Sequence, residues 1–147
     1  MVLILDLVHA LLYVTFTMNA INFLRNHGIQ PTAQRVAIAE AVLENSHHPT
    51  AEEILVDAQR RCSIVSRATV YNSLKLFVEK GMLRTQIIRE GTIVYDPNVQ
   101  NHHHFIDEED GSITDIPWEW LTVEGKQKLK DYDIREYQVI LRGRKKR

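Results

Sequence analysis

Cysteine is nearly absent from this chain of 147 residues, which contains only Cys62. A single cysteine excludes a disulfide within the chain and a structural zinc site built from four cysteines. It fits a reducing compartment, where thiols stay reduced. We therefore expect a cytoplasmic protein that does not depend on a four-cysteine zinc.

An excess of one charge is also absent, because 18 Lys and Arg stand against 19 Asp and Glu. Composition therefore gives no sign of nucleic-acid binding, and residues 19–95 carry only nine basic against seven acidic residues. Any phosphate-binding surface would have to arise from local clustering. The apolar share of 44% is typical of a folded domain, and the length fits one ordinary domain or two small ones.

Long apolar runs are missing except at the start, where residues 1–17 read MVLILDLVHALLYVTFT. This run has no basic segment or cleavage site of a signal peptide, and Asp6 interrupts it as a membrane span. From Met18 the composition is that of an ordinary domain. We expect that Met18 is the natural start and that 1–17 are an extension, with no membrane partner. The alternative is an apolar helix that packs on the domain or on a partner.

Polar caps and glycine stops predict four helices followed by a β-hairpin in residues 19–96. Thr50 with Glu53 three residues later forms a capping box, and Gly81 ends the last helix. The segments MLRTQIIR and TIVYD flank the turn EG as hairpin strands do. The predicted helices are 19–27, one capped by Thr32, one from Thr50 to about Arg61, and one capped by Ser66. This is the order of a winged helix-turn-helix domain.

The rest of the chain predicts a second, smaller domain. HHHFID and SITDI read as two strands joined by EEDG, and REYQVILRG alternates as a strand does. Residues 118–131 are predicted to be helical. We therefore expect an α+β protein with a winged helix-turn-helix domain at 18–95, a hinge at 96–101 and a small α/β dimerisation domain at 102–147.

The helix after Ser66 has a polar face opposite its apolar stripe. Arg and Lys can contact phosphates or guanine, Asn can contact adenine, and a small side chain can touch a thymine methyl group. The alternative is the solvated face of an amphipathic helix. The set predicted to contact DNA is Arg35, Arg67, Ala68, Thr69, Tyr71, Asn72 and Lys75.

The run of three histidines predicts a metal site. On a strand, His102 and His104 share one face and His103 faces away, and Asp115 on the paired strand can join the pair. Asp96 at the end of the hairpin and His48 before the third helix add ligands. Such a nitrogen and oxygen set suits Fe(II), Mn(II) or Zn(II). The alternatives are histidines without a ligand, a non-haem iron enzyme using His102, His104 and Asp115, and a haem protein.

The segments HGIQPTAQR, HHPTAEEI, SRATVYNSLKLFVEKGML, HHHF and ITDI resemble the ferric uptake regulator family over residues 19 to about 142. The resemblance implies metal-responsive transcription regulators, not enzymes, that bind palindromic operators in double-stranded DNA as homodimers. Carried over by motif, the regulatory ligands are His48, Asp96, His102, His104 and Asp115. The family's paired C-x-x-C motifs are absent.

Two branches of the family remain open. Asp at position 115 resembles the peroxide-sensing branch, in which bound Fe(II) reacts with hydrogen peroxide and the histidine ligands are oxidised. The HHH run and the ending LRGRKKR resemble the iron response branch, which responds to haem through His102, His103 or His104. We expect a metal-dependent repressor in either case.

Overall fold

The computed structural model describes residues 19–45, 47–89 and 91–146. The chain forms two compact units, one ending at Val99 and one starting at Gln100, and each is described by itself. The apolar run of residues 1–17 lies outside the described residues. Among the residues that the structure does describe, no helix has the length and apolar character that crossing a membrane requires.

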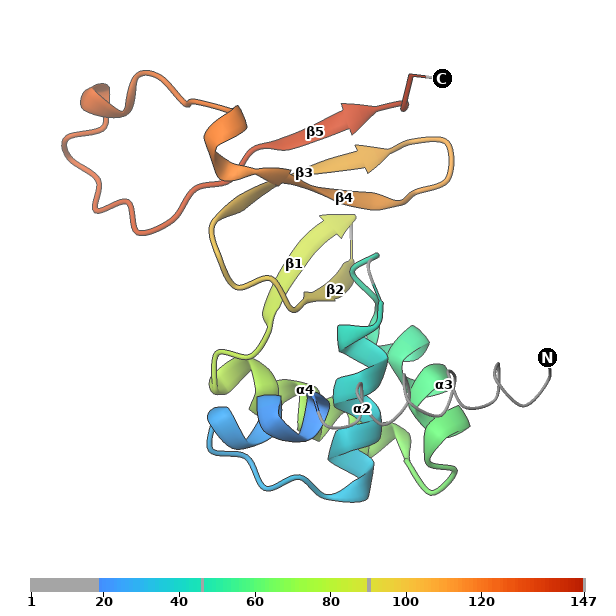
Figure 1. Ribbon diagram of the computed structural model, residues 1–147. Coiled ribbons are helices and arrows are strands. Elements are labelled where there is room, and N and C mark those ends of the chain that lie inside the picture. Colours follow the sequence, from blue (N-terminus) through green and yellow to red (C-terminus); the bar gives the residue numbers. More distant parts are fainter. Residues whose placement is uncertain (1–18, 46, 90, 147) are drawn as a thin grey trace, which may run out of the picture. The chain divides into compact units, whose positions relative to one another are not determined.

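The first unit is built from helices that begin at polar caps, as predicted (Figure 1). Residues 19–26 are helical, and α2 (Ala33–Leu43), α3 (Ala51–Arg61) and α4 (Arg67–Glu79) follow. Thr32, Thr50 and Ser66 each accept a hydrogen bond from a backbone N–H of the first turn. Each such cap contributes about 1 kcal/mol, so short-range sequence signals fix where all three helices begin.

A single apolar core holds these helices together. Leu24, Ile38, Ile54, Leu74 and Phe77 are all at most 1% exposed. α2 packs on both α3 and α4, so the polar face of α4 is turned away from the core.

One charged cluster ties α2 to α3. Arg61 pairs with Glu44 and with the buried Glu40, at 2.6 and 3.6 Å. Burial lowers the pKa of Arg61, but the hydrogen bond and charge of Glu44, with the charge of Glu40, outweigh it and raise the pKa above its ordinary value. The guanidinium therefore stays charged and compensates a carboxylate in the core.

The predicted hairpin forms the wing of the first unit. β1 (Arg84–Arg89) and β2 (Thr92–Asp96) pair antiparallel, with Thr85 opposite Tyr95. The Tyr95 N–H donates to the Pro49 carbonyl oxygen at 2.9 Å, and Thr50 bridges to Val94. The loop before α3 is therefore fixed against β2, which places His48 beside the end of that strand.

The second unit is a three-stranded sheet with β3 (His102–Asp107) in the middle. β4 (Ile113–Pro117) pairs antiparallel with β3, as predicted, and β5 (Ile140–Gly143) pairs parallel with it. The predicted strand over 135–143 is shorter than expected, because ladder bonding to β3 starts only with the Val139 carbonyl.

The helix predicted over 118–131 is wrong. The segment contains only two short 3-10 turns, Trp118–Trp120 and Lys126–Lys128. Neither has a side-chain cap, and Gly125 adopts a left-handed φ of 85°, which ends any right-handed helix there. The apolar residues of this segment also fail to recur at helical spacing, so a helix would have no stripe to bury.

Candidate metal centre

Three potential ligands converge on one face of the C-terminal sheet. His102 and His104 lie two residues apart on β3, and their Nε2 atoms are 2.9 Å apart. Asp115 stands directly opposite His104 on β4. Its Oδ1 lies 3.7 Å from His102 Nε2 and 3.9 Å from His104 Nε2. The pleat of β3 and the register with β4 therefore place the three atoms as predicted; we call His102, His104 and Asp115 the sheet group.

The His102 ring is oriented by its other nitrogen. Nδ1–H donates to the Gln100 carbonyl oxygen at 2.7 Å, which leaves the Nε2 lone pair facing His104. Metal-binding histidines use this arrangement, because the outer hydrogen bond fixes the ring and its tautomer. Both imidazoles are nearly inaccessible to solvent, with side-chain exposures of 5% and 0%.

The sheet group fits a single metal ion. The largest of its three separations is 3.9 Å. Metal–nitrogen and metal–oxygen bonds of about 2.1 Å allow one ion to contact two atoms separated by up to about 4.2 Å. Two imidazoles and a carboxylate form a ligand set that suits Fe(II), Mn(II) or Zn(II).

A second pair of potential ligands lies in the first unit. His48 Nε2 and Asp96 Oδ2 are 3.4 Å apart, and both side chains are buried. The other carboxylate oxygen, Asp96 Oδ1, accepts a hydrogen bond from the Asn98 N–H at 2.7 Å. We call His48 and Asp96 the loop group, because His48 belongs to the loop before α3.

The backbone at His48 is strained. Its φ of 54° is in the left-handed region, which non-glycine residues rarely adopt, and such residues cost about 1–3 kcal/mol. The bonds of Pro49 and Thr50 to β2 hold this conformation in place. The neighbouring His47 is exposed, and its N–H is bonded to Asn45 Oδ1. Of two adjacent histidines, the fold therefore turns only His48 toward Asp96.

His103 faces the opposite side of the sheet, as predicted. Its ring stacks on Trp118 with centroids 4.6 Å apart, and its Nδ1 accepts a hydrogen bond from the Val139 N–H. The side chain is completely buried. An axial haem ligand needs an accessible ring nitrogen, so His103 as it stands here serves packing and the anchoring of β5.

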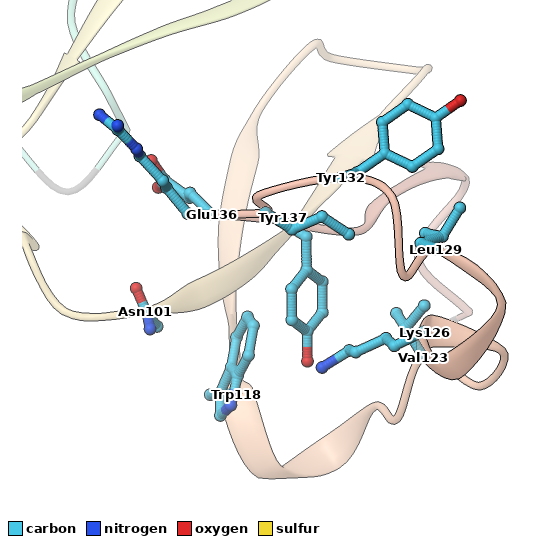
Figure 2. A pocket seen from close by; sticks show the side chains of 10 residues that line it. Asn101, Trp118, Val123, Lys126, Leu129, Tyr132, Glu136 and Tyr137 are labelled. Atoms are coloured by element: carbon cyan, nitrogen blue, oxygen red, sulfur yellow. The ribbon is translucent and has the colours of Figure 1, made fainter.

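A cavity of about 410 Å³ lies beside Trp118 in the second unit (Figure 2). The Tyr137 ring lies between Trp118, 4.5 Å away, and the Lys126 amine, 3.8 Å from its centroid. The aromatic cluster of His103, Trp118 and Tyr137 was not foreseen from the sequence, because its members are up to 34 residues apart. The aromatic residues themselves were the only available signal.

The residues predicted to contact DNA form an exposed face on α4. Arg67, Ala68, Tyr71, Asn72 and Lys75 are exposed. Thr69 is half-buried, and its hydroxyl is bonded to the cap residue Ser66. Arg35 lies on α2, where its Nη1 donates to the Gln30 carbonyl oxygen. The structure therefore brings five of the seven residues onto one solvent-facing surface.

Comparisons with known proteins agree with the sequence motifs. A family model described as the ferric uptake regulator family matches residues 26–142. The chain is 30% identical over 122 residues to the peroxide-responsive repressor PerR of Staphylococcus epidermidis, covering 82% of this chain and 81% of the relative.

Solved structures share the fold. A zinc-bound manganese uptake regulator is 21% identical with a TM-score of 0.64, covering 86% of this chain and 98% of that one. The ferric uptake regulator of Vibrio cholerae is 22% identical with a TM-score of 0.62, covering 84% and 98%. At this identity the likeness concerns the fold alone, and it confirms the predicted α+β class.

Proposed function

Since the chain belongs to the ferric uptake regulator family of metal-sensing transcription regulators, we propose that it is a metal-dependent DNA-binding repressor. The family's members are regulators and not enzymes, so the non-haem iron enzyme is set aside. The observation that carries the proposal is the convergence of His102, His104 and Asp115 on one point of a buried strand face.

Both ligand groups take part in the proposed mechanism. Only five residues separate Asp96, the last residue of β2, from His102, the first of β3. When bound, the metal ion supplies one positive centre for the five ligands His48, Asp96, His102, His104 and Asp115. By sharing that centre, the loop group and the sheet group restrict the hinge at 96–101. Metal binding favours the restricted arrangement only through its higher affinity for it.

The restricted arrangement acts on DNA through α4. In a homodimer, two copies of α4 would enter successive major grooves of a palindromic operator, which requires a defined spacing between them. The second unit offers a surface for the homodimer, because apolar side chains gather in its irregular segment. Those that are exposed are Trp120, Val123, Leu129, Tyr132 and Ile134. A protein that acts on genomic DNA in this way belongs in the cytoplasm of a bacterial cell.

The test is DNA binding by the full chain without metal and with Mn(II), Fe(II), Zn(II) or haem in turn. A duplex pool of random sequence supplies the ligand, and sequences retained with each addition are counted. We expect selection of a palindrome with Mn(II) or Fe(II) and none after chelation. Equal binding with and without metal would contradict the proposal, and binding that is released by haem would favour the haem-responsive alternative.

Peroxide sensing is tested separately from metal dependence. Fe(II)-loaded protein treated with hydrogen peroxide should gain one oxygen atom on His48 or His102, and Mn(II)-loaded protein should not. His47 and His103 serve as internal controls, because one is exposed to solvent and the other faces away from the ligands. Peptide mass spectrometry that finds oxygen spread evenly over all histidines would exclude the peroxide-sensing branch.

A further inference from the structure

The carboxylate of Glu52 in α3 contacts two residues of the DNA-facing surface. Its Oε1 accepts hydrogen bonds from Nη1 of Arg67 and from the hydroxyl of Tyr71, the latter at 3.2 Å. Arg67 and Glu52 also form an ion pair. One carboxylate oxygen therefore joins the first turn of α3 to the polar face of α4.

The two adjacent glutamates of α3 have separate tasks. Glu53 completes the capping box with Thr50, so its carboxylate is engaged at the helix start. Glu52 is not needed for the cap and reaches α4 instead. Arg67 is the first residue of α4 and Tyr71 lies one turn later, so both present their side chains on the same face. The contact is a specific arrangement of three side chains.

The contact is open to solvent and contributes little to folding. The side chains of Arg67 and Glu52 are 63% and 50% exposed, and exposed ion pairs are weak. Tyr71 is 47% exposed. An arriving DNA duplex can therefore reach all three side chains and compete for them.

We infer that Glu52 is a specificity-determining residue of the DNA-binding surface, an inference that rests on the proposed function of α4. A guanidinium has five N–H donors in one plane, and Glu52 engages donors at Nη1. The remaining donors are held in one direction, as a bidentate contact to a guanine edge requires. Phosphates accept arginine in many orientations, so they gain nothing from this restriction.

The charge of Glu52 acts in the same direction. A carboxylate beside Arg67 repels DNA phosphates and cancels part of the arginine's attraction for them. On a duplex without the matching base, no base contact offsets this loss. Glu52 therefore weakens binding to unrelated DNA more than binding to the cognate sequence.

The test compares Glu52→Gln with wild-type protein, both as full chains loaded with Mn(II). The probes are a duplex selected by wild-type protein from a random pool and a scrambled duplex of the same composition. Affinities are measured between about 50 and 200 mM KCl, because phosphate contacts depend on salt. For Glu52→Gln we expect about 2–5-fold tighter binding to the scrambled duplex and a salt slope steeper by about one. The selected duplex should be bound no more tightly, so the ratio of the two affinities falls.

Glu79→Gln is the matched control. Glu79 pairs with Lys75 on the same helix at 3.9 Å, so the variant removes the same charge beside a different DNA-facing residue. It should tighten binding to both duplexes equally. An equal change in both affinities for Glu52→Gln, or no change in either, would overturn the role of Glu52.

Arg67→Ala separates failure of this inference from failure of the proposed function. It should weaken binding to the selected duplex by at least tenfold, because a bidentate base contact is lost. If Arg67→Ala weakens binding but Glu52→Gln leaves the affinity ratio unchanged, only the role of Glu52 is refuted. If Arg67→Ala has no effect, α4 does not read DNA, and both conclusions are refuted.

Discussion

The loop group and the sheet group hold the same types of ligand by different means. In the sheet group, the pleat of β3 and its register with β4 place three ligand atoms within 3.9 Å of one another. In the loop group, His48 faces Asp96 only because a left-handed backbone residue is held between β2 and α3. One group is set by regular pairing, and the other depends on a strained loop.

This difference suggests a division of labour between the two groups. A preformed set of ligands loses little freedom on binding and should supply most of the metal affinity. A strained loop that depends on its neighbours is better suited to transmit metal occupancy to the helical unit, because small changes can release it. The following predictions test this division, from the largest expected effect to the smallest.

Replacing a ligand of the sheet group should have the largest effect. We expect His102→Ala to lower Mn(II) affinity on the order of 100-fold, since changes even to groups that only support ligands cost about 10–100-fold. Isothermal titration calorimetry measures it. His47→Ala removes an exposed imidazole and should change nothing. An unaltered affinity in His102→Ala would place the metal elsewhere.

The reverse face of β3 should affect stability and not metal binding. His103→Ala removes the stack on Trp118 and the acceptor for the Val139 N–H, and we expect a loss of about 2 kcal/mol in the free energy of unfolding by urea. His103→Phe keeps a ring and should lose about 1 kcal/mol. A fall in Mn(II) affinity as large as that of His102→Ala would mean that His103 is itself a ligand.

The loop group should matter less for affinity than for coupling. His48→Asn removes the imidazole but keeps a side chain that tolerates a positive φ. We expect Mn(II) affinity to fall about tenfold, because the sheet group remains. The gain in DNA affinity on adding Mn(II), measured by fluorescence anisotropy, should disappear. A 100-fold loss of metal affinity would show that the two groups contribute equally.

The smallest effect is expected from the cap beside the loop group. Thr50→Ala and Ser66→Ala each remove a helix cap and should each cost about 1 kcal/mol of stability. Only Thr50 follows the loop that holds His48, so only Thr50→Ala should also weaken Mn(II) binding, by about twofold to threefold. If both variants weaken Mn(II) binding alike, a general loss of stability would explain the effect.

Local sequence signals predicted what depends on neighbouring residues. The caps of Thr32, Thr50 and Ser66, the hairpin, and the shared face of His102 and His104 all follow from spacings of a few residues. These features are fixed by helix and strand periodicity and by cap chemistry, whatever the rest of the chain does.

Features that depend on distant residues could not be predicted. The parallel pairing of β5 with β3 joins residues 36 apart, as the bond from the Val139 N–H to His103 shows. The contact of Glu52 with Arg67 spans 15 residues and two helices. The wrong helix at 118–131 had a different cause: weak helical patterning outweighed Gly125, which stops the helix. Whether the five ligands bind one ion stays a prediction.

The most direct test is the affinity for Mn(II) measured with and without the selected duplex. Coupling between two binding equilibria is reciprocal, so the factor by which Mn(II) tightens DNA binding must equal the factor by which DNA tightens Mn(II) binding. We predict a factor of about 10 or more in wild-type protein, and a factor near one in His48→Asn, which still binds Mn(II). Undiminished coupling in His48→Asn, or no coupling in wild-type protein, would contradict a metal-controlled regulator that uses both ligand groups.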